Sequence, residues 1–143
     1  MHRFVLLYHE CPPDYVRPSH WDFMLESGEV LRTWALAELP RAWESARLKT
    51  AAIGRSCPPA AGGDCVDAEP LGDHRLAYLD FEGPLSGDRG NVKRIDKGTF
   101  MSVAESPQSW QIELAGEHLR GMATLRQSSA DEPQWALTAN VER

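Results

Sequence analysis

Glycine and proline interrupt this chain at short intervals, and this feature constrains its fold most strongly. The 143 residues include 11 glycines and 10 prolines, which favours many turns and short strands over a helical bundle. A domain of this length buries about two thirds of the surface that its unfolded chain exposes, so its core needs no disulfide or structural metal. We therefore expect residues 1–143 to form one mostly β domain in which any bound metal is functional.

The segments between these breaks predict a succession of short antiparallel strands, arranged as a sandwich or a barrel. The predicted strands cover residues 3–9, 20–26, 30–36, 75–81, 92–95, 99–104, 110–114, 119–125 and 134–138. Gly98 is expected to end the fifth of these strands. Pro40 is expected to start a short helical turn over 40–46. The Pro58-Pro59 and Gly62-Gly63 pairs predict a mobile surface loop at about 56–67.

The segment 20–26 has the most regular pattern of these predicted strands. Its residues alternate between an apolar face and a more polar face, which are Trp21, Phe23 and Leu25 against His20, Asp22, Met24 and Glu26. Strict alternation of this kind predicts a half-buried strand. Ser27-Gly28 then supplies a turn, so we expect a hairpin with residues 30–36.

The charge balance limits the ways in which this chain can bind nucleic acid. It carries 15 basic and 21 acidic residues, a net charge of -6. That is the wrong sign for a protein that coats nucleic acid without sequence preference. An enzyme that acts on nucleic acid remains consistent with this composition if its positive charge is local.

Cysteine usage and the N-terminus indicate the cellular compartment. Cys11, Cys57 and Cys65 are irregularly spaced, which fits neither a disulfide framework nor a paired metal or redox motif, and we interpret them as reduced thiols in loops. The apolar run from Phe4 to Tyr8 is too short for a signal peptide. No stretch approaches a membrane span. We therefore expect a cytoplasmic protein.

The His20-x-Asp22 pair is the first candidate for chemistry. On a strand, the period of two places both side chains on one face, roughly 6.6 Å apart at Cα, which is close enough to bind one cation. His9 on a neighbouring strand would complete a set of two imidazoles and one carboxylate, which suits Mn, Zn or Fe. The alternative is a hydrogen-bonded surface pair without a metal.

Two further clusters carry groups that bind phosphate. His74, Arg75 and Tyr78 combine a titratable donor, a fixed cation and a hydroxyl, which can hold a phosphate and stabilise developing charge; the alternative is a polar turn. The segment 89–97 holds four basic residues and one acidic residue, and its cations Arg89, Lys93 and Arg94 can follow a nucleic-acid backbone. The alternative for this segment is a solvated face.

These clusters stand in an order that resembles a known family. The resemblance rests on His9 after an apolar strand, on the H-x-D-F-x-L-E run at 20–26 and on the D-H-x-L-x-Y-x-x-F-E-G run at 73–83. Leu-Arg-Thr-Trp-Ala-Leu at 31–36 and Leu-Arg-Gly at 119–121 extend it over most of the chain. The family is the 3'-phosphoesterase domain attached to bacterial ligase D of DNA end joining, which also occurs as small free-standing proteins.

This resemblance implies an antiparallel β-barrel whose cavity holds a divalent metal, manganese or else zinc or another transition metal. It implies an enzyme that removes 3'-phosphates or terminal ribonucleotides from DNA 3' ends. We expect a monomer that has a DNA ligase or end-joining protein as partner. Residue by residue, His9, His20 and Asp22 fall on metal ligands, His74 on a phosphate-contacting histidine, and Tyr78 and Glu26 on further active-site positions. Arg75 and Arg32 are then candidates for phosphate or nucleic-acid binding.

Three positions depart from the family pattern. Met24 stands where the family carries an arginine, Glu38 stands where the family carries a lysine, and the segment from His9 to His20 is longer than usual. Arg17, Arg32 and Arg75 are candidate replacements for the missing cations. The alternative hypothesis that follows from these departures is a noncatalytic module that binds nucleic-acid ends.

Overall fold

The computed structural model describes residues 2–44, 65–85 and 89–139 of the chain. Most of these residues lie in antiparallel strands, as expected. The strands are β1 (His2–Glu10), β2 (His20–Ser27), β3 (Val30–Leu36), β4 (Cys65–Pro70), β5 (His74–Arg75), β6 (Gly83–Pro84), β7 (Asn91–Ser106), β8 (Ser109–Gly116), β9 (Arg120–Gln127) and β10 (Trp135–Ala139). The helices of this part of the chain are α1 (Arg41–Glu44) and the 3-10 helix η2 (Leu76–Leu79). None of its helices has the length and apolar content that a bilayer crossing requires.

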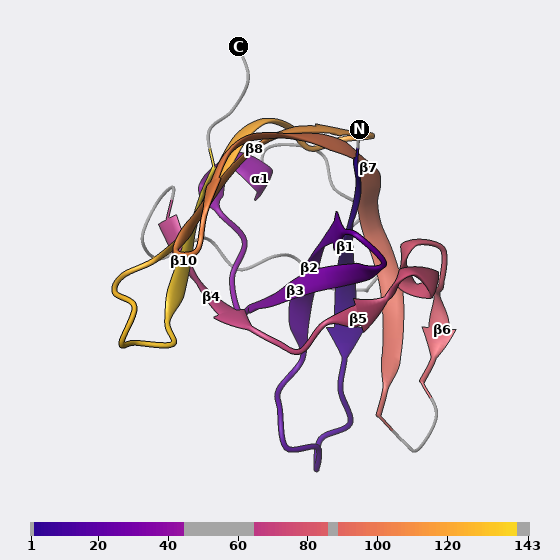
Figure 1. The fold of residues 1–143 in the computed structure, drawn as a ribbon. Helices are drawn as coiled ribbons and strands as arrows, with labels where there is room; N and C mark the ends of the chain where they lie inside the picture. Colours follow the sequence, from indigo (N-terminus) through magenta and orange to yellow (C-terminus); the bar gives the residue numbers. More distant parts are fainter. Residues whose placement is uncertain (1, 45–64, 86–88, 140–143) are drawn as a thin grey trace.

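Eight of the strands close into an antiparallel barrel (Figure 1). Their order is β1-β2-β3-β4-β10-β9-β8-β7, and β7 pairs with β1 to complete the circuit. The two short strands β5 and β6 lie outside this circuit and pair with β3 and β7. The predicted barrel is therefore confirmed, with one additional segment attached to its outer wall.

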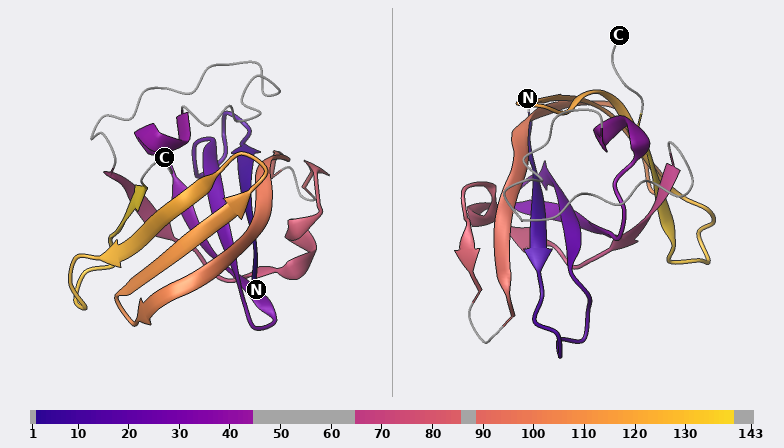
Figure 2. Two further views of the ribbon diagram at one scale, coloured as in Figure 1. Left: turned by 90° about the horizontal axis from the view of Figure 1, so that it is seen from above. Right: turned by 180° about the vertical axis from the view of Figure 1, so that it is seen from behind.

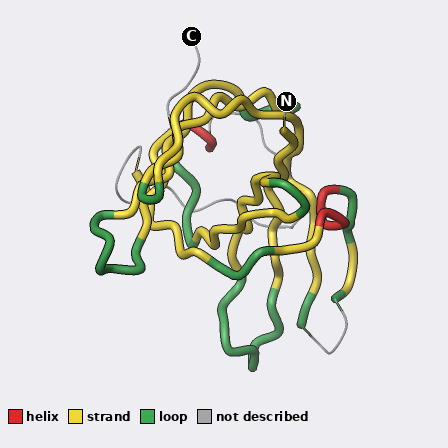
Figure 3. The backbone as a smooth tube through the Cα atoms, in the orientation of Figure 1, coloured by secondary structure: helices red, strands yellow, loops and turns green. Residues whose placement is uncertain are grey.

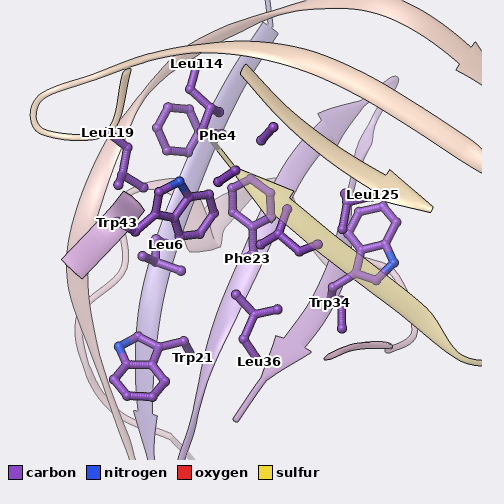
Figure 4. Packing of buried hydrophobic residues seen from close by; sticks show 14 of the residues in the cluster. Phe4, Leu6, Trp21, Phe23, Trp34, Leu36, Trp43, Leu114, Leu119 and Leu125 are labelled. Atoms are coloured by element: carbon purple, nitrogen blue, oxygen red, sulfur yellow. The ribbon is translucent and has the colours of Figure 1, made fainter. Parts of the chain in front are cut away.

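The interior of the barrel is filled by apolar side chains. Trp21, Phe23 and Leu25 of β2 are buried there, which confirms the face predicted from their alternation. Trp43 of α1 packs edge-on against Phe23, with ring centroids 5.1 Å apart, and Figure 4 shows it among residues from several strands. Side chains rather than solvent occupy the interior, so a substrate site must lie elsewhere.

The outer face of β2 is buried as well, so the expectation of a half-buried strand is wrong. Met24 packs there with the other members of a second apolar cluster, which are Val5, Leu7, Leu31, Leu79 and Val92. The segment 71–85, which contains β5, η2 and β6, covers this cluster, and Figures 2 and 3 show it beside β7 on the outside of the barrel. Strand alternation alone gave no indication of this cover.

Within this covering segment, the predicted strand at 75–81 is also wrong. Only His74 and Arg75 pair as β5, and η2 follows from Leu76 to Leu79. In a 3-10 helix, residues three apart lie on the same side, so Leu76 and Leu79 can both face the barrel wall. Both pack against the second apolar cluster, which explains why this segment turns instead of continuing as a strand.

The predicted loop at about 56–67 is corrected at its C-terminal end. Residues 56–64 lie outside the described residues, but Cys65 to Asp67 belong to β4, which pairs with β10 and β3. Val66 and Ala68 are buried in the core, so the strand follows a period of two that the nearby glycines and prolines obscured. The predicted turn at 40–46 is confirmed over α1, and residues 45–46 are not described.

Gly98 does not end a strand, because β7 continues through it to Ser106. A Cβ atom at Gly98 would lie 2.3 Å from the Ala115 carbonyl oxygen and 2.5 Å from the Gly116 Cα. Glycine therefore permits the close approach of β7 and β8, and it is compatible with strand structure at such a position.

We expect Gly98→Ala to destabilise the fold by about 1–3 kcal/mol, because the added methyl group meets backbone atoms that cannot rotate away. Gly72→Ala is the matched control, since nothing lies within 4 Å of a Cβ at that position. Urea unfolding of both variants measures the difference. Equal stability of the two variants would show that β7 and β8 separate at little cost.

Candidate metal and phosphate site

A cavity of about 150 Å³ lies on the outer wall of the barrel, between the strands and the segment 71–85. We call it the outer-wall cavity. The residues that line it are Leu7, His9, Tyr15, Arg17, His20, Asp22, Met24, Leu71, His74, Tyr78, Leu85, Arg89 and Val92. This position corrects the expectation of a cavity inside the barrel, because the outer faces of β1, β2 and β7 form the floor of the site.

The strand register brings His9, His20 and Asp22 together. His9 of β1 is directly opposite His20 of β2, and Asp22 lies two residues further along β2 on the same face. Asp22 Oδ1 is 3.0 Å from His20 Nε2, and Asp22 Oδ2 is 3.8 Å from His9 Nδ1. Both imidazoles thus present one ring nitrogen to the same carboxylate.

The other ring nitrogen of each histidine is bound to a backbone carbonyl. His9 Nε2 is 2.7 Å from the Arg89 oxygen, and His20 Nδ1 is 2.8 Å from the Pro18 oxygen. A carbonyl oxygen only accepts hydrogen bonds, so these nitrogens carry the protons. In the neutral form of each ring, His9 Nδ1 and His20 Nε2 then present lone pairs to Asp22. This is the arrangement in which histidine binds a metal in proteins, with its orientation fixed by the second nitrogen.

Asp22 itself is buried and incompletely satisfied. Asp22 is only 3% exposed, and its Oδ1 has no hydrogen-bond partner in the structure. A carboxylate oxygen and an imidazole lone pair 3.0 Å apart repel each other unless a cation or a proton lies between them. Burial lowers the pKa of His20, but its interaction with the Asp22 carboxylate outweighs this effect and raises the pKa overall. Two imidazoles and one buried carboxylate fit a divalent transition metal.

His74 and Tyr78 line the same cavity as His9, His20 and Asp22, although more than 50 residues separate the two groups in the sequence. The pairing of β5 with β3 places His74 beside Leu31. His74 Nδ1 donates a hydrogen bond to the Gly72 oxygen at 2.8 Å, which leaves Nε2 for a ligand. The Tyr78 ring packs edge-on against the His74 ring, with centroids 5.5 Å apart. The structure thus brings the two predicted clusters to one cavity.

Basic side chains outnumber acidic ones in the lining of the outer-wall cavity, although the chain as a whole is acidic. Its lining includes three histidines, two arginines and one aspartate. Arg17 enters from the loop between β1 and β2 and pairs with Glu69 at 2.7 Å. Arg89 and Tyr78 also line an adjacent recess, together with Arg75. An anionic ligand that extends from the cavity into this recess would meet one further cation, Arg75.

Glu26 does not lie in the outer-wall cavity, although the family resemblance implied an active-site position. It lies four residues beyond Asp22 on the same strand, which is about 13 Å along the chain. There its carboxylate accepts hydrogen bonds from the Arg3 backbone nitrogen at 2.8 Å and from Arg3 Nη2 at 2.7 Å. These hydrogen bonds lower the pKa of Glu26 to about 2.

We expect Glu26→Gln to lower the melting temperature at pH 7 and to have no effect on phosphate chemistry. A carboxyl group with a depressed pKa stabilises the fold fully above about pH 4.5, its ordinary value, and this contribution disappears as the pH falls towards 2. The melting temperatures of wild type and variant should therefore converge over that range. A constant difference from pH 7 to pH 2 would contradict this role for the ion pair.

Arg32 is also placed away from the outer-wall cavity. It shares a face of β3 with the buried Trp34, and its guanidinium lies 5.0 Å from the ring of Trp34 and 5.2 Å from that of Trp110. Its Nη1 is 3.6 Å from Glu105. Stacking on two indole rings stabilises this position and directs Arg32 away from the candidate metal ligands.

The basic segment 89–97 is divided by the strand that it enters. Arg89 precedes β7 and lines the outer-wall cavity, but Lys93 and Arg94 point to opposite faces of β7, since neighbouring residues alternate. Lys93 is in register with Tyr8 of β1, and Arg94 is held by Glu82, which accepts a hydrogen bond from its backbone nitrogen. These three cations do not form one continuous track.

Three residues at or beside the site come from one loop. The sequence did not predict a site role for two of them, Tyr15 and Cys11, and it offered Arg17 only as a candidate replacement for a missing cation. Tyr15, Arg17 and Cys11 all belong to the loop between β1 and β2, whose path has no periodicity to read. The Cys11 sulfur lies within 4.8 Å of a ring nitrogen of both His9 and His20. Cys11 comes two residues after His9, and this spacing indicates that both lie on the same side of the strand. The Pro12-Pro13 pair indicates instead that the strand ends here, so Cys11 was interpreted as a loop thiol. Burial and the charge of Asp22 raise the pKa of the Cys11 thiol.

A known protein family matches most of this chain. The model of the DNA Ligase D 3'-phosphoesterase domain matches residues 14–127, well over half of the chain. This range includes His20, Asp22, His74 and Tyr78, whereas His9 precedes it. Comparison with curated proteins gives no significant match.

Proposed function

This chain belongs to the DNA ligase D 3'-phosphoesterase domain family, and from that premise we propose that its outer-wall cavity removes phosphates from DNA 3' ends with a divalent metal. Terminal ribonucleotides are the second class of 3' end that we propose as substrate. Manganese is the proposed cation. The protein would act as a monomer in the cytoplasm, on ends that a DNA ligase or end-joining partner then uses.

One observation carries the proposal of a metal. Asp22 is buried, its Oδ1 has no hydrogen-bond partner in the structure, and one ring nitrogen of each of two imidazoles faces its carboxylate. A metal at His9, His20 and Asp22 would satisfy all three groups at once. When bound there, a divalent cation supplies charge neutralisation for a phosphoryl oxygen and a lower pKa for an attacking water molecule.

Three other residues that line the cavity suit the phosphate group. The Gly72 carbonyl accepts a hydrogen bond from His74 Nδ1 and so orients the ring. When the ring carries both protons, Nε2 can donate to a nonbridging phosphate oxygen or transfer its proton to the leaving oxygen. Arg17 lines the cavity in which Met24 supplies no cation, and we propose that it replaces the arginine that the family carries at that position. Tyr78 lies beside His74 and can donate its hydroxyl proton to the same phosphate.

The adjacent recess suits the strand that leads to the reacting end. Arg75 and Arg89 line it, and Tyr78 and Phe81 add aromatic surface. Cations bind backbone phosphates, and aromatic rings stack with unpaired bases. We propose that the nucleotide next to the 3' end lies in this recess, which would explain how an acidic protein binds DNA locally.

A noncatalytic end-binding module is the second candidate, and the burial of Met24 favours it. Met24 is 1% exposed and packs in the second apolar cluster, so no charged group reaches the floor of the cavity from this position. A module of this kind would bind the DNA end and the metal without turnover.

A panel of DNA ends distinguishes the two candidates. Duplexes that carry a 3'-phosphate, a 3'-terminal ribonucleotide, a 3'-hydroxyl or a 5'-phosphate are incubated with the protein, and the products are separated by electrophoresis. The enzyme should shorten or dephosphorylate only the first two substrates. Binding of 3' ends without any product would support the module, and removal of 5'-phosphate at the same rate would contradict a 3'-specific site.

A further inference from the structure

We propose that the thiolate of Cys11 is a further ligand of the metal centre formed by His9, His20 and Asp22, and that it makes this centre selective for thiophilic cations such as Zn²⁺ and Co²⁺. This inference rests on the proposed function, because it assumes the same metal centre. It concerns a residue of the loop between β1 and β2, in the segment from His9 to His20 that is longer than the family pattern.

The geometry brings the sulfur to the metal centre. The sulfur of Cys11, one nitrogen of His9 and one nitrogen of His20 all lie within 4.8 Å of one another. Around a tetrahedral zinc ion, with bonds of about 2.0 Å to nitrogen and 2.3 Å to sulfur, neighbouring ligand atoms are about 3.3–3.6 Å apart. A side-chain movement of about 1 Å is therefore sufficient for all three atoms to bind one ion.

The backbone holds Cys11 in this place. Cys11 lies one residue after the end of β1, so it continues on the side of the strand that carries His9. Its backbone nitrogen donates a hydrogen bond to Ser19 Oγ at 2.9 Å, and Ser19 directly precedes His20. Both ends of the loop are thus joined next to the two imidazoles, and the loop fixes the thiol relative to them.

Two further observations point to a cation as the partner of this thiol. The side chain of Cys11 is partly buried and free, and its contact with the His9 carbonyl oxygen is long, at 3.9 Å. The carboxylate of the buried Asp22 faces both imidazoles of this cluster, and its Oδ1 has no hydrogen-bond partner in the structure. Two imidazoles, one carboxylate and one thiolate complete the four-ligand set that Zn²⁺ prefers.

The thiolate changes the preference of the centre among metals. Soft sulfur ligands favour zinc and cobalt, whereas manganese prefers oxygen ligands and a higher coordination number. A zinc ion bound by four protein side chains would leave no open position for water or phosphate. We therefore expect zinc to bind tightly and to inhibit, and manganese to bind without the thiolate and to support turnover.

Titration of the metal-stripped protein with Co²⁺ tests this proposal by absorption spectroscopy. The wild type should develop visible d-d bands together with a near-ultraviolet sulfur-to-cobalt charge-transfer band. Cys11→Ser should keep the d-d bands, lose the charge-transfer band and bind Zn²⁺ about tenfold more weakly or worse, with unchanged affinity for Mn²⁺. Cys65→Ser is the matched control, since Cys65 is an exposed thiol on β4, and it should retain both bands.

The spectra separate failure of this inference from failure of the proposed function. Wild-type d-d bands without a charge-transfer band, or a charge-transfer band that survives in Cys11→Ser, would overturn the role of Cys11 and leave the metal centre intact. If the wild type gives no cobalt spectrum at all, the metal centre itself is wrong and both proposals fail. The wild-type spectrum is decisive even if a variant does not fold.

Discussion

Asp22→Ala is expected to abolish manganese-dependent release of 3'-phosphate from DNA. The variant removes the carboxylate of the candidate metal set, and the two remaining imidazoles cannot neutralise the charge of the cation. Phosphate release and Mn²⁺ affinity by calorimetry are the two measurements. The melting temperature of the variant is measured as well, so that loss of activity can be distinguished from unfolding.

Asp67→Ala provides the matched control for this experiment. Asp67 is an exposed aspartate on β4 and does not line the outer-wall cavity, so its loss removes the same charge from the whole protein. It should leave activity and metal affinity unchanged. Manganese-dependent turnover by Asp22→Ala at the wild-type rate would remove Asp22 from the metal centre.

His74→Ala is expected to slow turnover by about 10²-fold or more, the scale for loss of one donor to a transition state. The affinity for manganese should stay close to the wild-type value, because His74 belongs to β5, whereas the three candidate ligands belong to β1 and β2. This separation of kcat from metal affinity distinguishes a phosphate contact from a metal ligand.

His118→Ala is the control histidine. The His118 backbone nitrogen donates to Asp96, and this hydrogen bond does not depend on the side chain, so the variant should retain full activity. If His74→Ala loses metal binding together with turnover, His74 acts as a ligand and the proposed division of roles is wrong.

The local pattern of the strands could be predicted because alternation directly determines which face a side chain occupies. The positions of Trp21 and Phe23 in the core, and of His20 and Asp22 on the other face, follow from this period. The same rule places Arg32 beside Trp34, so the position of Arg32 was also available from the sequence. The prediction of phosphate binding for Arg32 rested on its charge and not on its place in the strand.

The position of the site outside the barrel could not be predicted, because it depends on contacts between distant segments. His74 reaches the cavity through the pairing of β5 with β3, and η2 covers the outer wall through Leu76 and Leu79. A single turn of 3-10 helix has too few residues for a recognisable period. The position of the Arg17 side chain depends on an irregular loop, and the structure shows its direction by its ion pair with Glu69 and its place in the cavity lining.

Release of inorganic phosphate from a 3'-phosphorylated DNA duplex tests the central claim most directly. The purified wild-type protein is assayed as isolated, after treatment with a chelator, and after dialysis and addition of manganese. The account predicts that the chelator stops phosphate release and that manganese restores it. Phosphate release at an undiminished rate in the chelator, or none with manganese present, would contradict a metal-dependent phosphoesterase site on the outer wall of the barrel.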